Sequence, residues 1–293
     1  MVTGGALYLA SVNSNIERAD LISTSAAAAP QSAKGALNIA ILGSATPEAV
    51  SPRKGEGRVV MVLHISADRK QASLVSFPSD TYVSIPGHGS GPLSSTYGLG
   101  GAKLTVSTLQ KALDTRIDHA MVAKFAGFQA LARQVGPISV KNPDAFTNEG
   151  VTFDEGTIKL SPEQALDYVK RTPGEATSEG QAARQRIVLE AGMRKGLSRD
   201  VLSSPAKLNR FVNTTTKNTT VDKGFTAGTI AKIARSLRLE RDDVTLVRVP
   251  LSDDLMTKKG MEVRAVDTKQ FKALATALAD DKLDSYIDKY PTE

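Results

Sequence analysis

A single carboxylate marks the point where an apolar segment of the chain breaks off. In the stretch LVSFPSDTYVSI, residues 74–85, an apolar run ends at Phe77, Pro78 interrupts it, and Asp80 comes just before a second alternating run. Proline has no backbone N–H to give to a sheet, so a strand ends there. Side chains displayed at such ends often carry function, and we expect Asp80 to face a site.

Four basic residues flank a short loop further along the chain. Lys170 and Arg171 end one predicted helix, and Arg184 and Arg186 lie in the first turns of the next. The planar fork of arginine matches phosphate oxygens, so two helix ends that meet there could hold one anion. A solvated basic surface is the alternative, because such clusters also occur without an anionic ligand.

Other arrangements that carry chemistry are missing from the sequence. Without cysteine, the chain forms neither a disulfide nor a thiolate metal site. The histidines, His64, His88 and His119, have no carboxylate at a metal-binding spacing, and there is no G-x-S-x-G elbow. The glycine-rich stretches PGHGSGP and YGLGGAKL match no nucleotide-binding pattern, so we interpret them as a turn and the approach to a helix.

The composition indicates a globular protein with a basic surface. The chain has 293 residues, 41% of them hydrophobic, and a formal net charge of +6. Such a charge suits phosphates, anionic lipid or wall polymers, although basic surfaces without an anionic partner are equally common. Tryptophan is missing and aromatic residues make up only 5% of the chain, which argues against the stacking platforms of nucleic-acid binders. We therefore expect no nucleic-acid partner.

Strand and helix patterns alternate along the chain, which predicts an α/β fold. The apolar runs at 58–66 and 71–77 are joined by a short turn and predict a β-hairpin. Ser161 is followed by Pro162 and Gln164, the pattern of a capping box with proline in the first turn. The other expected strands are 37–44, 119–125 and 243–250, and the expected helices are 100–114, 126–136, 161–171, 178–197, 226–239 and 267–280.

The two ends of the chain differ from its body. Residues 1–16 carry no charge and are mildly apolar, but the stretch is shorter than the roughly 18–20 residues of a spanning helix. We interpret residues 1–36 as the outer end of a membrane helix followed by an Ala/Ser-rich linker, with a poorly ordered leader as the alternative. The expected globular domain covers residues 37–280, and residues 281–293 form a tail.

Several motifs, in their order along the chain, resemble the LytR-CpsA-Psr family. They are NIAILGS, GRVVMVLHI, ASLVSFPSDTYVSIPGHG, the segment from YGLGG to ARQVG, and EGTIKLSPEQALDYVKR, and they cover most of residues 37–192. The resemblance implies one LytR-CpsA-Psr domain, a mixed β-sheet flanked by helices with an apolar lipid pocket. It also implies a cell-membrane protein with a single pass and its domain outside the cytoplasm.

The resemblance further implies a role in building the cell wall. Members of the family transfer an anionic glycopolymer from a polyprenyl-pyrophosphate carrier to peptidoglycan, and arginines and a Mg²⁺ held by aspartates bind the pyrophosphate. The expected partners are therefore a polyprenyl-pyrophosphate-linked glycopolymer, peptidoglycan, and the membrane through an N-terminal helix.

Several positions depart from the site pattern of the family. Ala45 and Val60 stand where the family has the aspartates of its metal site, and Ser79 stands where it has an arginine. The resemblance carries over Asp80 and Arg58 as catalytic positions, and Asp80 as a metal ligand that has lost its expected partners. The implied phosphate-binding residues are Arg58, Lys170, Arg171, Arg184 and Arg186.

Two functions from different classes stay open on the sequence. The first is an active glycopolymer phosphotransferase with a rebuilt site, which the length of the resemblance favours. The second is a family member without catalysis, which binds a polyprenyl (pyro)phosphate or a wall polymer as an accessory or scaffold protein. The replaced positions favour the second function, because Mg²⁺ requires oxygen ligands and usually takes one or two carboxylates.

Overall fold

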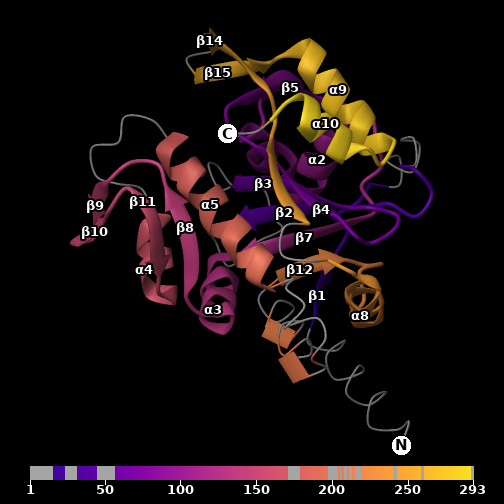
Figure 1. Ribbon diagram of the computed structural model, residues 1–293. Coiled ribbons are helices and arrows are strands. Elements are labelled where there is room, and N and C mark those ends of the chain that lie inside the picture. The colour runs from indigo at the N-terminus through magenta and orange to yellow at the C-terminus, as the bar shows by residue number, and fades with distance from the viewer. Residues whose placement is uncertain are drawn as a thin grey trace, which may run out of the picture.

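A seven-stranded mixed sheet forms the main layer of the protein, and it confirms the expected α/β class (Figure 1). The structure is a computed structural model and describes residues 16–23, 32–44, 57–170, 179–196, 204, 206–207, 210, 213–214, 219–239, 243–258 and 261–291. In spatial order, the strands are β1 (Glu17–Ala19), β12 (Thr219–Asp222), β7 (His119–Lys124), β2 (Leu37–Ser44), β3 (Gly57–Ile65), β4 (Ala72–Phe77) and β13 (Val244–Arg248).

The strand directions bring several chain segments to one edge of this sheet. β2 is parallel to β7 and β4 is parallel to β13, while β3 runs against both of its neighbours. The carboxyl ends of β2, β4 and β7 therefore lie at the same edge as the start of β3. There Ser44 pairs with Gly57 and Lys124, and Val60 pairs with Phe77. The predicted hairpin is confirmed as β3 and β4.

Helices cover both faces of the main sheet, because its central strands are apolar on both sides. The helices are α2 (Ser95–Leu113), α8 (Ala227–Ser236), α9 (Thr268–Ala279) and α10 (Leu283–Lys289). α2, α9 and α10 pack on the face that holds Val60, Val62 and Phe77. α8 packs on the opposite face, against Ile39 and Ile65.

A second sheet brings the end of the chain next to the segment that follows β4. Its strands, in spatial order, are β14 (Leu251–Lys258), β15 (Met261–Val266), β5 (Thr81–Ile85) and β6 (Gly89–Pro92). β5 and β6 form a hairpin around the predicted turn, where Gly87 and Gly89 have φ values of 75° and 74°. β15 runs parallel to β5 with Arg264 opposite Thr81, so a distant part of the sequence reaches Asp80.

A smaller unit packs beside the main sheet (Figure 1). Its elements are α3 (Phe125–Val135), β8 (Ile138–Asn142), β9 (Phe146–Asn148), β10 (Val151–Phe153), β11 (Gly156–Leu160), α4 (Pro162–Tyr168) and α5 (Glu179–Gly196). Ser161 and Gln164 form the predicted capping box at the start of α4. α5 contacts β8 in this unit and also β3 and β13 of the main sheet, so it joins the two parts.

The folded body extends beyond the predicted domain limits at both ends. β1 pairs with β12, and Ile16 and Leu21 are buried. At the other end of the chain, Leu283 and Tyr286 of α10 are also buried. Both segments are short, so their few apolar residues do not stand out in the sequence from a linker or a tail. Residues 1–15, the predicted membrane-helix end, lie outside the described part, and no described helix has the length and apolar character needed to cross a bilayer.

α2 begins earlier than the sequence indicates. The expected helix starts at Gly100, whereas α2 starts at Ser95 and bends at Gly100 and Gly101. Gly101 has φ 65° and ψ −162°, a backbone conformation that is essentially restricted to glycine. The glycine-rich stretch is therefore a kink inside a helix, because the buried Thr96 and Tyr97 already belong to the helical segment before it.

Candidate functional site

Hydrogen bonds hold the segment that carries Asp80. The carbonyl of Pro78 accepts from the backbone N–H and from Oγ1 of Thr81, at 3.1 and 2.7 Å. The carbonyl of Ser79 accepts from the N–H of Ser94 at 2.9 Å. Since these hydrogen bonds hold the carbonyls of the two preceding residues, Asp80 occupies a fixed place just past the carboxyl end of β4.

The partner of Asp80 is Arg264. Nε of Arg264 donates to Oδ2 of Asp80 at 2.8 Å, and the backbone N–H of Arg264 donates to the carbonyl of Asp80 at 3.1 Å. The side chains of Arg264 and Asp80 are 17% and 26% exposed, so salt screens this ion pair less than a fully exposed one. Sequence reasoning missed Arg264, because nothing local in MEVRAV connects this arginine with residue 80.

The residues at the predicted metal positions do not fit Mg²⁺. Val60 is 4% exposed and packs among apolar side chains of the main core. Ala45 lies outside the described residues, and neither side chain contains an oxygen. Among the described residues, no group of three or more His, Asp or Glu side chains is arranged to hold a metal. Because Mg²⁺ requires oxygen ligands, these residues do not build the site that the family pattern implies.

Lys170 is engaged by two carboxylates. Its Nζ lies 2.8 Å from Oδ1 of Asp167 and 3.8 Å from Oε1 of Glu149. The hydrogen bond with Asp167, helped by the charges of both acids, raises the pKa of Lys170. The side chain keeps its positive charge at neutral pH, but a phosphate would have to compete with both acids for it.

Arg184 is buried and closes the end of α4. Its Nε donates to the carbonyl of Tyr168 at 2.7 Å, and its Nη2 donates to the carbonyl of Lys170 at 2.9 Å. The last carbonyls of a helix have no helical N–H to accept from, so the guanidinium supplies what α4 lacks. Arg184 thus has a structural role that the sequence did not indicate, and its predicted role in phosphate binding stays a prediction.

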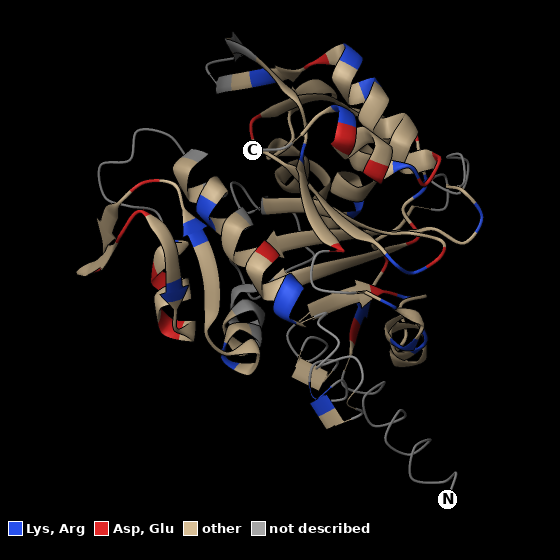
Figure 2. Cartoon of the chain, in the orientation of Figure 1, with Lys and Arg blue, Asp and Glu red and all other residues tan. Residues whose placement is uncertain are grey.

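The other predicted phosphate-binding residues fall outside what the structure describes. Arg171 is not described, and of Arg58 and Arg186 only the backbone is described, in β3 and α5. The pairing of Val60 with Phe77 carries the start of β3 alongside the segment that leads to Asp80. The backbone of Arg58 and Asp80 therefore share one edge of the sheet. Figure 2 shows acidic and basic residues interspersed over α5 and the smaller unit, so the charge there is mixed.

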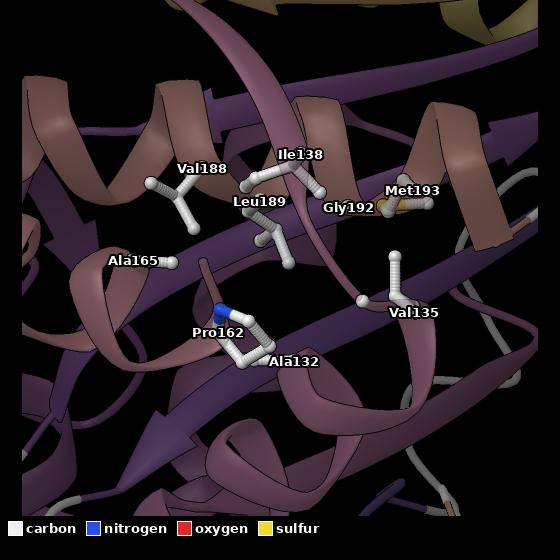
Figure 3. Close-up of a pocket in the computed structure, with 10 residues that line it drawn as sticks. Ala132, Val135, Ile138, Pro162, Ala165, Val188, Leu189, Gly192 and Met193 are labelled. Carbon is white, nitrogen blue, oxygen red and sulfur yellow. The ribbon is translucent and has the colours of Figure 1, made fainter. Parts of the chain in front are cut away.

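An apolar pocket lies between three helices of the smaller unit (Figure 3). Side chains of α5 face those of α3 and of the first turns of α4 across it. The cavity has a volume of about 50 Å³. Its lining residues are Ala132, Val135, Gly136, Ile138, Pro162, Ala165, Val188, Leu189, Gly192 and Met193. None of them is charged, so the lining is apolar, but the cavity is smaller than the roughly 300–1,000 Å³ of typical ligand pockets.

Fold and site together define an α/β protein with a carboxylate–arginine pair at the strand ends of a mixed sheet. The chain belongs to the LytR-CpsA-Psr family, whose model matches residues 6–280. The resemblance found in the sequence motifs is thereby confirmed, and the match begins before residue 37, in agreement with the pairing of β1.

The chain is similar to curated proteins named polyisoprenyl-teichoic acid–peptidoglycan teichoic acid transferase TagU. Identity to TagU of Enterococcus faecalis is 32% over 194 residues, which are 66% of this chain and 63% of that protein. Identity to TagU of Bacillus mycoides is 28% over 238 residues, 77% of each chain. The chain thus spans less than two thirds of the E. faecalis relative.

Solved structures show the same fold. TagV of B. subtilis matches with a TM-score of 0.68 at 19% identity, over 87% of this chain and 98% of that one. A structure described as TagT bound to LI-WTA matches with a TM-score of 0.62 at 21% identity, over 84% and 90% of the two chains. At these identities the likeness establishes the fold.

Proposed function

We propose that the protein transfers an anionic glycopolymer from a polyprenyl-pyrophosphate carrier to peptidoglycan. Membership of the LytR-CpsA-Psr family and the similarity to TagU transferases support this function. The observation that carries it is that Asp80 and the backbone of Arg58 share the edge of the sheet where β2 and β4 end and β3 begins. Ligands of open α/β sheets bind at the carboxyl ends of strands.

The proposed chemistry is a phosphoryl transfer. A hydroxyl of peptidoglycan attacks the phosphorus that carries the glycopolymer, a new P–O bond forms, the bridging P–O bond of the pyrophosphate breaks, and polyprenyl phosphate leaves. Asp80 accepts the proton of the attacking hydroxyl. Arg58, Arg171 and Arg186 balance the charge on the phosphate oxygens. Lys170 and Arg184 contribute by holding the end of α4.

The apolar partner in this proposal is the polyprenyl tail. Family membership supports this partner. The pocket between α3, α4 and α5 is apolar, but at about 50 Å³ it is too small for such a chain. The uncharged residues 1–16 support attachment to the cell membrane by one N-terminal helix. The resemblance to the family motifs implies that the domain lies outside the cytoplasm.

A second candidate function is binding without turnover. The specific observation in its favour is Val60, which is buried in the core where the family pattern has an aspartate. In this case the protein holds a polyprenyl (pyro)phosphate or a wall polymer as an accessory protein. The fold and the basic residues serve that function equally well.

One experiment separates the two candidates. A polyprenyl-pyrophosphate-linked oligosaccharide of short chain length is mixed with peptidoglycan and the full chain, and both transfer and binding are measured. Transfer that disappears in Asp80→Asn supports the transferase. Binding without transfer supports the accessory protein. If the chain neither binds nor transfers this substrate, both candidates are wrong.

A further inference from the structure

The disagreement between the family's metal site and this chain points to a different way of handling an anion. A carboxylate beside a pyrophosphate repels it unless a cation stands between them. In the family pattern a divalent metal held by aspartates is that cation. Here one aspartate remains, Asp80, and Val60 is apolar and buried. The residual carboxylate therefore needs another source of positive charge.

Arg264 supplies that charge by direct contact. Its Nε lies 2.8 Å from Oδ2 of Asp80, and its backbone N–H binds the carbonyl of Asp80 at 3.1 Å. The parallel pairing of β15 with β5, which sets Arg264 opposite Thr81, fixes the arginine in register. One backbone and one side-chain hydrogen bond join the two residues. Their contact is therefore better fixed than an ion pair between two long surface side chains.

We infer that Arg264 replaces the divalent metal at this site, and that the protein binds its pyrophosphate ligand without Mg²⁺. The inference rests on the proposed function for the nature of the ligand. Arg264 acts as a positioning residue: it neutralises Asp80 and keeps the carboxylate oriented, so that the negative charge of Asp80 does not repel the phosphates.

Substitution of Arg264 and Asp80 together should have an effect that a purely structural role of Arg264 would not produce. If Arg264 works by neutralising Asp80, removing the arginine harms anion binding only while the carboxylate is present. Removing both residues restores binding. If Arg264 merely stabilised the fold, or touched the phosphate itself, the second substitution would bring no recovery.

The experiment is a calorimetric titration of the full chain with inorganic pyrophosphate and, separately, with farnesyl pyrophosphate, each in Mg²⁺ and in EDTA. The natural protein should bind with affinities that differ by less than about twofold between the two buffers. Arg264→Gln should lose about tenfold or more in EDTA, and Arg264→Gln with Asp80→Asn should return to within about threefold of the natural affinity. Asp80→Asn alone should bind at least as tightly as the natural protein.

A matched control removes another arginine that pairs with an aspartate. Nε of Arg116 lies 3.5 Å from Oδ1 of Asp118. This pair is next to the start of β7, at the opposite edge of the sheet. Arg116→Gln should leave the affinities for pyrophosphate and farnesyl pyrophosphate unchanged. Should Arg264→Gln fail to fold, as a lost unfolding transition would show, Asp80→Asn alone still tests the inference, because weaker binding in EDTA would contradict it.

The outcomes distinguish this inference from the proposed function. A loss of pyrophosphate affinity in EDTA, or no recovery in the double variant, overturns the inference. If pyrophosphate behaves as expected but farnesyl pyrophosphate does not bind, the metal-free site stands and the proposed lipid substrate is wrong. If neither ligand binds in either buffer, the inference and the proposed substrate are both wrong.

Discussion

The guanidinium of Arg184 lies over the ring of Phe146, 4.6 Å from its centroid. The same group donates to the carbonyls of Tyr168 and Lys170 at the end of α4. A residue that sequence alone assigns to an anion site is thus tied to an aromatic ring and to a helix end. The stability of the smaller unit depends on it.

Arg184→Ala should lower the free energy of unfolding by about 2–4 kcal/mol, because the buried carbonyl of Tyr168 and the partly buried carbonyl of Lys170 lose a charged donor and a cation–π contact is lost. Denaturant unfolding followed by circular dichroism measures this loss. The comparison is Gln181→Ala, which removes a neutral donor, Nε2, 3.2 Å from the carbonyl of Val169, and should cost about 1 kcal/mol. Equal effects of the two substitutions would contradict the capping role of Arg184.

The pH dependence of stability should show the contribution of Asp222. Burial alone would raise the pKa of this carboxyl, but hydrogen bonds from His119 and from the N–H groups of Ala120 and Gly224 lower it below its usual value. A carboxyl with a lowered pKa stabilises the fold above its unfolded pKa of about 3.9, and the stabilisation is lost as the pH falls through the folded pKa.

Unfolding free energies of the natural protein and of Asp222→Asn, measured from pH 6 down to pH 3, test this. The difference should be about 1–3 kcal/mol near pH 6 and should shrink below about pH 4. Asp154→Asn, at an exposed aspartate, should give only a small difference. A gap for Asp222→Asn that widens on acidification would contradict the assignment.

Gly101→Ala should destabilise the protein by about 1–3 kcal/mol, because φ 65° with ψ −162° is closed to a residue with a Cβ. The matched substitution is Gly192→Ala in α5, where an added Cβ meets no atom within 4 Å. That change should stabilise the helix by about 0.5–1 kcal/mol. Thermal unfolding of both variants should therefore give shifts of opposite sign, and a higher melting temperature of Gly101→Ala would show that the kink in α2 relaxes.

Val60→Asp should cost at least about 2 kcal/mol more than Val60→Ala, because it places a carboxylate in an apolar core. Adding Mg²⁺ should restore none of this loss, since Asp80 is already paired with Arg264. Denaturant unfolding in Mg²⁺ and in EDTA provides the measurement. Recovery in Mg²⁺ would mean that residues 60 and 80 can share an ion and that one substitution separates this chain from a metal site.

Local signals predicted much of the framework. The apolar runs gave β2, β3, β4, β7 and β13 almost to the residue, and the capping box at Ser161 and Gln164 placed the start of α4. These features depend on neighbours in sequence, which is where hydrophobic periodicity and helix caps act. The kink at Gly101 lay beyond such rules, because a glycine pair reads equally well as a turn before a helix.

The contacts that make the site were not predictable in the same way. Arg264 reaches Asp80 only through the parallel pairing of β15 with β5, and no pattern within either strand encodes that pairing. Arg184 is one of the predicted anion binders, yet its environment buries it. Charge and residue type are local properties, whereas burial and partner choice follow from the tertiary fold.

The order of strands in the main sheet has a consequence for how the chain is made. Glu17 pairs with Thr220, and Ala72 pairs with Val244, so each end of the sheet joins an early segment to a late one. Until residues 219–248 emerge, the outer edges of β4 and β7 have no neighbour, and open strand edges recruit other chains. Such distant pairings also slow folding. The nascent protein therefore depends on protection from aggregation until its last third is synthesised.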